Sequence, residues 1–227
     1  MNRNDQRVID GLRKQAELRE QALSGADRLG WKSGFGTEGA MSLIGVEQPL
    51  TGFLTSATLA DDGAEIQVGD WGMPLLEPEV AVKLGSELGP GASTEEASAA
   101  ISAVAAAIEL VDLGSIESVE EILAGNIFHR HVLLGEFIDC RPGELEGVRI
   151  AVTANGDSSP PADPVEVIGD IGKVVAALAD QVDLFGETFQ PGDIVITGAA
   201  VPPAPVQSGE DYRVELNNGS GVSVGIS

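Results

Sequence analysis

The sequence contains a single cysteine, Cys140, among its 227 residues. One cysteine excludes an internal disulfide and any zinc site built from several cysteine ligands. It also makes a reducing, cytoplasmic setting the default expectation. The first residues are polar and charged with no apolar core behind them, so no secretory or transit peptide is expected. No apolar run reaches the length that a membrane-spanning helix needs.

Basic residues are also scarce, with 13 Lys and Arg against 36 Asp and Glu and a formal net charge of −23. Such a surface repels nucleic acid and anionic membranes, so we expect neither as a partner. The acids are spread along the chain, which indicates a solvated surface, either of a salt-adapted protein or of an ordinary acidic one. An anionic small substrate would need local positive charge from a metal ion, a lysine or an arginine.

Hydrophobic periodicity predicts helices over residues 5–23 and 171–184, and shorter ones over 38–43 and 118–123. Ser93 and Glu96 form a capping-box pattern, and the alanine-rich helix that follows is expected to run through residue 107. Residues 29–37 predict a strand that enters a glycine-rich loop, without either nucleotide-binding glycine pattern.

The remaining apolar stretches predict strands over residues 50–54, 74–84, 108–112, 148–154, 194–198, 212–216 and 221–226. The Asp61-Asp62-Gly63 sequence predicts a hairpin turn between two short strands. Strands outnumber helices and hairpin-scale turns join most of them. This pattern predicts one α+β domain, alone or with a small appendage, that contains a mixed or antiparallel sheet.

Residues 74–84 (PLLEPEVAVKL) carry the strongest chemical signal. In a strand, Glu77 and Glu79 project to the same side, while Pro78 between them suits an edge, a bulge or a strand start. Two carboxylates in an apolar strand repel each other unless a cation lies between them, and a hard divalent ion takes such oxygen ligands. The alternative is a half-exposed strand with both acids in water, which is the commoner reading of an isolated Glu-x-Glu.

Three further residues are candidates for the same site. Glu109 lies in an apolar run and needs a partner, so it is a candidate third ligand, whereas Asp112 reads as a strand-end residue. His129 and His131 are expected on one face of a strand. Either is a candidate general base or a group that supports the site. A histidine more commonly has no such role and is either hydrogen-bonded within the fold or exposed to solvent.

Five motifs occur in the order found in a known family: residues 31–37 (WKSGFGT), 45–49 (GVEQP), 76–85 (LEPEVAVKLG), 107–112 (AIELVD) and 192–198 (GDIVITG). They resemble the fumarylacetoacetate hydrolase superfamily, most closely its 2-hydroxypenta-2,4-dienoate hydratase and 4-oxalocrotonate decarboxylase branch. The resemblance runs from about residue 29 to the C-terminus. It implies a mixed β-sheet roll, with a small N-terminal helical or lid portion over residues 1–57 and a catalytic domain over 58–227.

The resemblance also implies a set of site residues. Mg²⁺ or Mn²⁺ would be held by Glu77, Glu79 and Glu109, and would bind the carboxylate and 2-oxo oxygens of a substrate. Lys32 would transfer protons, with His129 and His131 as further candidates. The residues expected to contact the substrate are Thr197, Asn126 and Arg130.

The implied function is lyase chemistry on a small 2-oxo or 2-hydroxy-dienoate acid from aromatic catabolism, with hydration of a double bond as the lead reaction. Decarboxylation or carbon–carbon hydrolysis on the same metal site is the alternative. A third expectation is an inactive ligand-binding homologue or partner subunit. By resemblance alone, we also expect a homo-oligomer and an association with a related decarboxylase or hydratase.

The chain departs from the hydratase pattern in three places. The family sequence Lys-Ile-Gly-Leu-Thr corresponds here to residues 32–37 (KSGFGT), which are one residue longer. The family has an acidic residue after the Gln-Pro pair, where this chain has Leu50. Small residues of the family are replaced by Phe128, His129, Arg130 and His131. The His-Glu pair of the hydrolytic members is represented by Glu38 without a histidine, which weighs against hydrolysis.

Overall fold

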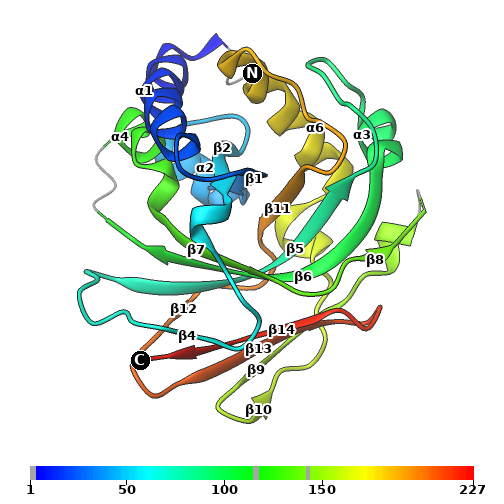
Figure 1. Cartoon of the computed structure of the whole chain (residues 1–227). Coiled ribbons are helices and arrows are strands. Elements are labelled where there is room, and N and C mark those ends of the chain that lie inside the picture. The colour runs from blue at the N-terminus through cyan, green and yellow to red at the C-terminus, as the bar shows by residue number, and fades with distance from the viewer. Residues whose placement is uncertain (1–3, 115–117, 142–143) are drawn as a thin grey trace.

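Two β-sheets and a layer of helices make up the computed structural model, which describes residues 4–114, 118–141 and 144–227. The nine-stranded sheet has the order β2-β1-β11-β5-β6-β7-β3, with β12 beside β5 and β8 beside β6. The five-stranded sheet has the order β10-β9-β13-β14-β4. The larger sheet lies between the helices and the smaller sheet (Figure 1). The predicted α+β fold with a mixed sheet is confirmed.

The strands of the larger sheet are β1 (Arg28–Gly34), β2 (Leu50–Thr55), β3 (Leu59–Ala60), β5 (Pro74–Leu84), β6 (Ile101–Asp112), β7 (His129–Leu134), β8 (Ile138–Asp139), β11 (Ile194–Ala199) and β12 (Ala204–Pro205). Those of the smaller sheet are β4 (Ala64–Ile66), β9 (Ile150–Ala154), β10 (Asp157–Ser158), β13 (Asp211–Leu216) and β14 (Gly221–Ile226). The α-helices are α1 (Gln6–Leu23), α2 (Glu38–Ile44), α3 (Thr94–Ala100), α4 (Val119–Ala124), α5 (Val165–Ile168) and α6 (Ile171–Val182). Short 3₁₀ segments are η2 (Ser56–Thr58), η3 (Asn126–Phe128), η4 (Glu144–Gly147) and η5 (Asp183–Phe185).

Side-chain caps begin five of these helices. Each cap accepts a hydrogen bond from a backbone N–H in the first turn, which satisfies a donor that the helix itself leaves free. At α3 the capping box between Ser93 and Glu96 is complete, as the sequence predicts. The caps are Asp5 for α1, Thr37 for α2, Ser93 for α3, Ser118 for α4 and Asp170 for α6.

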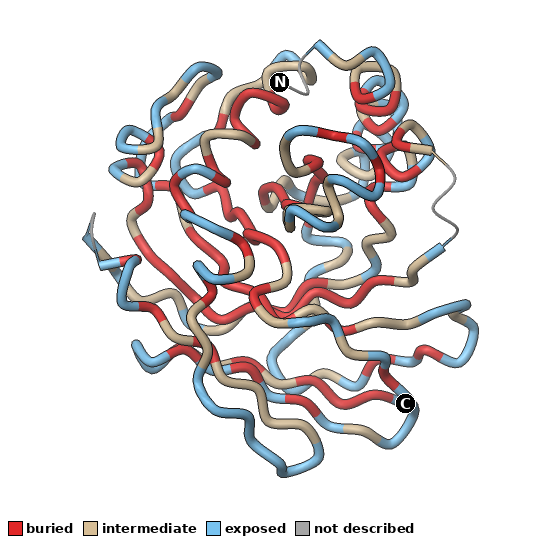
Figure 2. Tube along the Cα trace, turned by 180° about the vertical axis from the view of Figure 1, so that it is seen from behind, coloured by how far each residue is buried: buried red, intermediate tan, exposed pale blue. Residues whose placement is uncertain are grey.

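The long antiparallel pair β5 and β6 forms the centre of the molecule. Because side chains alternate along a strand, Val80 and Ile108 face one side and Glu79 and Glu109 face the other. The side that holds Val80 and Ile108 packs in the main core, which also contains buried residues of β13 and β14. Figure 2 shows buried stretches running along the strands of the larger sheet.

The larger sheet curls, so that its two ends approach each other. The side-chain amide of Asn126, just before β7, accepts a hydrogen bond from Phe53 N (2.9 Å) and donates one to Phe53 O (3.0 Å). Phe53 belongs to β2, which lies five strand positions from β7, or about 24 Å in a flat sheet. Lys32 of β1 contacts Glu109 of β6 across the face that carries the glutamates, so this face is the concave one.

The predicted helix over residues 93–107 is wrong in its second half. Helix α3 ends at Ala100, and Ala103–Ala107 lie within the central strand β6. Alanine favours helices, but β6 pairs on one side with β5 and on the other with β7 and β8. These tertiary pairings override the propensity of the alanines.

The predicted hairpin around Asp61–Gly63 is also wrong. Strand β3 pairs in parallel with β7 of the larger sheet, and β4 pairs in parallel with β14 of the smaller one. The turn is present, with Gly63 at a φ of 79°, but it carries the chain from one sheet to the other.

Pro78 lies in a central strand, where the sequence argument favours an edge, a bulge or a strand start. Its carbonyl accepts a hydrogen bond from Ala200 N (2.8 Å). The nitrogen and carbonyl of a strand residue point to the same side, so the proline nitrogen, which has no hydrogen to donate, also faces the end of β11. There Thr197 and Gly198 form a bulge opposite Val80, and the ladder is already interrupted. Because no regular strand partner lies opposite at this point, the missing N–H of Pro78 leaves no ladder hydrogen bond unmade.

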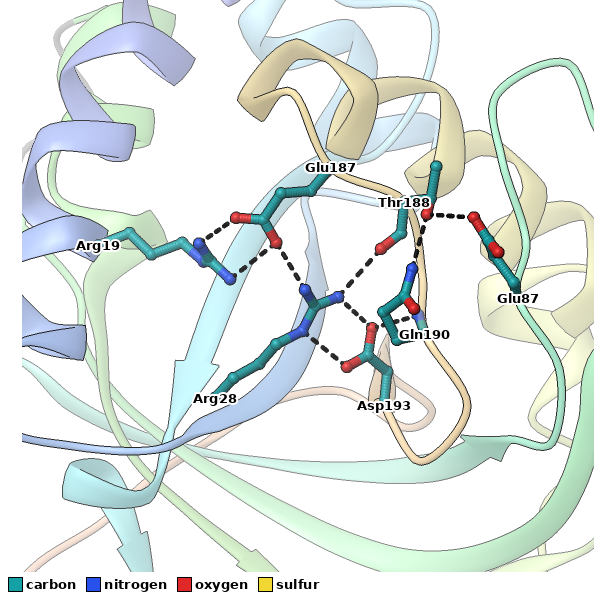
Figure 3. A network of polar contacts seen from close by, with 7 residues as sticks. All are labelled: Arg19, Arg28, Glu87, Glu187, Thr188, Gln190 and Asp193. Carbon is teal, nitrogen blue, oxygen red and sulfur yellow. Dashed lines mark hydrogen bonds and ion pairs between the residues drawn. The ribbon is translucent and has the colours of Figure 1, made fainter.

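A network of charged groups fastens α1 to the sheet (Figure 3). Glu187 pairs with Arg19 of α1 and with Arg28 of β1, and Arg28 also pairs with Asp193 before β11. Both guanidinium groups lie over the buried ring of Trp31, at 4.8 and 5.6 Å from its centre. The N-terminal helix is thereby fixed at the strand that carries Lys32.

The division at residue 57 stays a prediction. Strands β1 and β2 lie on its N-terminal side, yet they pair with each other and with β11 in the larger sheet. Among the helices of the described residues, none combines the length and apolar character needed to cross a membrane.

Ser220 is expected to be the most sensitive polar residue between the two sheets. Its buried hydroxyl accepts a hydrogen bond from Ala106 N (2.9 Å) and donates one to Glu136 O (2.7 Å), beyond the end of β7. Ser220→Ala leaves both backbone groups unpaired, and should lower the free energy of unfolding by about 2 kcal/mol in urea denaturation. Ser208→Ala, in an exposed turn, is the matched control and should be neutral. Equal stability of the two variants would contradict this role of Ser220.

Candidate functional site

Three glutamates meet on the concave face of the larger sheet. Glu77 pairs directly with Glu109 across β5 and β6, and Glu79 lies two residues further along β5. One carboxylate oxygen from each lies within 4.8 Å of the others. Glu79 and Glu109 are both 0% exposed. Carboxylates buried at this distance from one another need positive charge nearby.

Lys32 supplies one positive charge. It lies on β1, three strand positions from β6, and the curl of the sheet lets its ammonium group reach Glu109. Lys32 Nζ donates to Glu109 Oε1 and to Ile127 O, the latter at 3.2 Å. Lys32 is itself 1% exposed, so the pair is shielded from water.

His129 completes the contacts of this glutamate. Its Nδ1 lies 2.6 Å from Glu109 Oε1, and its Nε2 lies 2.8 Å from the hydroxyl of Thr58. Burial lowers the pKa of His129, against the opposing effect of the Glu109 charge. A neutral ring with both nitrogens engaged orients Glu109 and leaves Lys32 as the cation of the cluster.

The carboxylates have displaced pKa values. Burial, followed by repulsion from Glu109, raises the pKa of Glu77 to about 7. Burial and the charges of Glu109 and Glu77 raise the pKa of Glu79 well above its usual range. Burial acts in the same direction on Glu109, but Lys32 and His129 outweigh it, and the pKa of Glu109 is lowered. The second and third negative charges thus lack a counter-charge within the described residues.

The donor set fits a hard divalent cation. Glu79 Oε1 and Glu109 Oε2 are buried and have no hydrogen-bond partner. With all three glutamates ionised, the carboxylates and Lys32 sum to −3 + 1 = −2, which a divalent ion balances. Oxygen ligands of this kind suit Mg²⁺ or Mn²⁺.

The bulge in β11 sets the position of Glu79. Gly198 N donates a 2.7 Å hydrogen bond to Glu79 Oε2, and Gly198 has a φ of 98° that favours glycine. The hydroxyl of Thr197 donates to Val80 O (2.9 Å) and closes the bulge against β5. Thr197 thus lies beside the carboxylates, and its donor is already used by the backbone.

Asn126 also lies beside the cluster, with its amide committed to both backbone groups of Phe53. Gly52 makes the space for this arrangement. A Cβ at Gly52 would lie 2.7 Å from Lys32 Cγ and 2.8 Å from Asn126 Oδ1. Only a residue without a side chain lets the lysine stem and the amide lie together.

His131 and Arg130 lie away from the carboxylates, contrary to their expected places. A bulge at Arg130 shifts the register, so His131 pairs with Leu110 and faces the opposite side of the sheet from Glu109. Its ring stacks on Trp71, 6.1 Å between centres. Arg130 pairs with Asp112 at 3.0 Å, and its side chain is 53% exposed. The assumption that the two histidines share a face is wrong.

Sequence reasoning missed Thr58, Gly52 and Gly198 as members of the site. Thr58 carries no signal in the sequence, because its contact with His129 depends on the parallel pairing of β3 with β7. Gly52 did carry one, as a glycine in the fully buried strand β2, where it costs conformational entropy without packing.

Comparisons with known proteins place the chain among relatives of known name. A family profile described as fumarylacetoacetate (FAA) hydrolase C-terminal matches residues 37–226. A 4-oxalocrotonate decarboxylase from Pseudomonas sp. is 25% identical over 91% of this chain and 84% of its own length. A 2-hydroxyhexa-2,4-dienoate hydratase from Comamonas testosteroni is 28% identical over 88% of this chain and 78% of its own.

A solved structure is similar in fold. It is the 4-oxalocrotonate decarboxylase from Pseudomonas putida G7, complexed with magnesium and adipate, with a TM-score of 0.83 and 24% identity. The match covers 92% of this chain and 81% of that one.

Gly52→Ala should disturb the site through packing alone. The added methyl group overlaps the Lys32 stem and the Asn126 amide, so we expect the free energy of unfolding to fall by about 1–3 kcal/mol in urea denaturation. The matched control is Gly39→Ala, since a Cβ at Gly39 has no neighbour within 4 Å. A Gly52→Ala protein as stable as wild type would show that the site has more room than the structure describes.

Proposed function

The chain belongs to the fumarylacetoacetate hydrolase C-terminal family, and on this premise we propose that it is a divalent-metal-dependent lyase. Its lead reaction is hydration of the double bond in a small 2-hydroxy-dienoate acid of the 2-hydroxypenta-2,4-dienoate type. The observation that carries the proposal is the buried group of three carboxylates with two unpaired oxygens and one lysine. The hydratase and decarboxylase relatives support this class of substrate.

Glu77, Glu79 and Glu109 would hold Mg²⁺ or Mn²⁺. When bound, the ion would act as a Lewis acid on a substrate carboxylate and 2-oxo oxygen. The backbone N–H of Gly198 and the ring of His129 fix two of the three carboxylates in place. Fixed outer contacts of this kind tune the ligands that they touch.

Lys32 is proposed as the proton-transfer group. Its ammonium is the buried cation of the cluster, and its contacts with Glu109 and Ile127 aim Nζ at the carboxylates. His129 orients Glu109 through one nitrogen and contacts Thr58 through the other, so we assign it a positioning role. Thr197 and Asn126 position the bulge and β2, because their hydrogen-bond donors already serve the backbone.

Decarboxylation of a 2-oxo acid on the same carboxylates is the second candidate, favoured by the decarboxylase relative. Retention of three ligand carboxylates and Lys32 supports an active enzyme over an inactive homologue. We further propose a cytoplasmic homo-oligomer that associates with a related decarboxylase or hydratase, which native mass measurement and co-purification would test.

Glu79→Gln tests the catalytic proposal. Removing this ligand should abolish Mg²⁺ binding in calorimetry, and should lower turnover of 2-hydroxypenta-2,4-dienoate by about 100-fold or more. Loss of a group that only hydrogen-bonds to a metal ligand already lowers activity by about 10–100-fold, and loss of a ligand itself should cost at least as much. Glu95→Gln, on the exposed side of α3, is the matched control and should retain both properties. Turnover by the Glu79→Gln variant at the wild-type rate would contradict the proposed three-carboxylate metal site.

The gain in stability from Mg²⁺ should depend on pH. The pKa of Glu77 is raised to about 7, above its unfolded value, so protonation of Glu77 stabilises the metal-free protein at low pH and this contribution fades as pH rises through 7. Mg²⁺ binds the ionised form, so the rise in Tm that it causes should be larger at about pH 8 than at about pH 6. Thermal unfolding with and without Mg²⁺ measures this difference. An equal rise at both values would contradict Glu77 as a ligand.

A further inference from the structure

A single oxygen of Glu109 makes both hydrogen bonds that this carboxylate forms with described side chains. Lys32 Nζ and His129 Nδ1 both contact Oε1, the latter at 2.6 Å, whereas Oε2 is buried without a partner. The two contacts come from β1 and β7, on opposite sides of β6 in the larger sheet. The direction in which Oε2 points therefore depends on how firmly Lys32 and His129 are held.

The contact with Glu109 decides which nitrogen of His129 carries the proton. The His129 side chain is 2% exposed and shares Oε1 with the ammonium of Lys32, and both circumstances favour the neutral ring, which has one N–H. A carboxylate oxygen accepts hydrogen bonds and cannot donate, so this proton lies on Nδ1. Nε2 then has a bare lone pair, and it needs a donor because it is buried with the ring.

The hydroxyl of Thr58 is that donor. Its Oγ1 lies 2.8 Å from His129 Nε2 and 3.3 Å from Thr55 O, and one hydroxyl proton serves only one of them well. The shorter contact, to a buried nitrogen, takes the proton. A half-turn of the ring about its Cβ–Cγ bond would place carbon atoms at both Oε1 of Glu109 and Oγ1 of Thr58. The two hydrogen bonds together thus select one orientation of the ring.

The backbone of Thr58 is held independently of its hydroxyl. Thr58 ends η2, and the next residue, Leu59, begins β3, which pairs in parallel with β7 beside Val132. A hydrogen bond also joins the backbone of Thr58 to the ring of His131. These contacts do not involve the Thr58 hydroxyl, so a change of the side chain can remove its hydrogen bond and leave the strand in place.

Resting on the proposed function, we propose that Thr58 is a positioning residue for the metal site. Its hydroxyl holds His129 as the Nδ1–H tautomer in one orientation, and His129 in turn fixes Oε1 of Glu109. Oε2, which has no hydrogen-bond partner, is left for the proposed ion. Without the hydroxyl, Nε2 would be buried and unpaired, which costs free energy that the ring can recover only by moving. Outer contacts of this kind change the metal affinity of the ligands that they support.

Nitrogen NMR of the metal-free protein tests the hydrogen bonds directly. The chain has two histidines, so the signals of His129 are those that disappear in His129→Gln. At about pH 8, above the usual pKa of histidine, we expect Nδ1 to carry the proton and Nε2 to show the shift of a nitrogen that accepts a hydrogen bond. In Thr58→Val the Nε2 signal should move to the position of a nitrogen without a donor, while the signals of His131 stay unchanged as an internal control. A proton on Nε2, or an Nε2 signal that is the same in Thr58→Val, would overturn the inference.

Mg²⁺ binding measures the consequence for the site. Thr58→Val and Thr58→Ala should raise the Kd for Mg²⁺ about tenfold in calorimetry, the lower end of the effect of losing an outer contact of a metal ligand. Thr58→Ser keeps the hydroxyl and should restore the wild-type affinity. Thr153→Val removes a hydroxyl that contacts Ser158 in the smaller sheet, and as the matched control it should bind Mg²⁺ as the wild type does. Wild-type affinity in Thr58→Val, or failure of Thr58→Ser to restore it, would contradict the positioning role.

The same titrations separate this inference from the proposed function. If the wild type binds no Mg²⁺, the proposed metal site fails and the role of Thr58 there fails with it, whichever tautomer His129 adopts. If the wild type binds Mg²⁺ and Thr58→Val binds it equally well, the site stands and only the role of Thr58 fails.

Discussion

The burial of three carboxylates around one ammonium group is the constraint on which the rest of the structure depends. Glu77, Glu79 and Glu109 face the concave side of β5 and β6, and Lys32 reaches them from β1. One lysine offsets one charge, and the raised pKa values of Glu77 and Glu79 show the cost of the other two. The divalent ion that we propose would balance these charges with all three acids ionised, and would account for their burial.

The fold maintains this arrangement through backbone contacts at the ends of strands. The bulge in β11 turns the N–H of Gly198 toward Glu79, while Asn126 draws the start of β7 to β2 and closes the roll. The network of Arg19, Arg28 and Glu187 holds α1 over Trp31, next to Lys32 in the chain. Each of these contacts joins residues distant in sequence, so the cluster depends on the whole fold.

The sequence predicted much of the fold because many of its features follow from local patterns. Helix α1, the capping box at Ser93 and the alternation of Glu77 and Glu79 are set within a few residues. The meeting of Glu109 with Glu77 and Glu79 was instead implied by the family resemblance, since it depends on the pairing of β5 with β6. The failures arose where distant partners decide. Strand pairing converts Ala103–Ala107 from helix to strand, and the bulge at Arg130 turns His131 away from Glu109.

The most direct test of the three-carboxylate centre is anomalous scattering from crystals grown with Mn²⁺ and oxalate, a mimic of the 2-oxo acid. The account predicts one strong Mn²⁺ peak among Glu77, Glu79 and Glu109, with oxalate bound to the ion. A crystal with millimolar Mn²⁺ and no peak between these carboxylates, or with the ion bound only elsewhere, would contradict it.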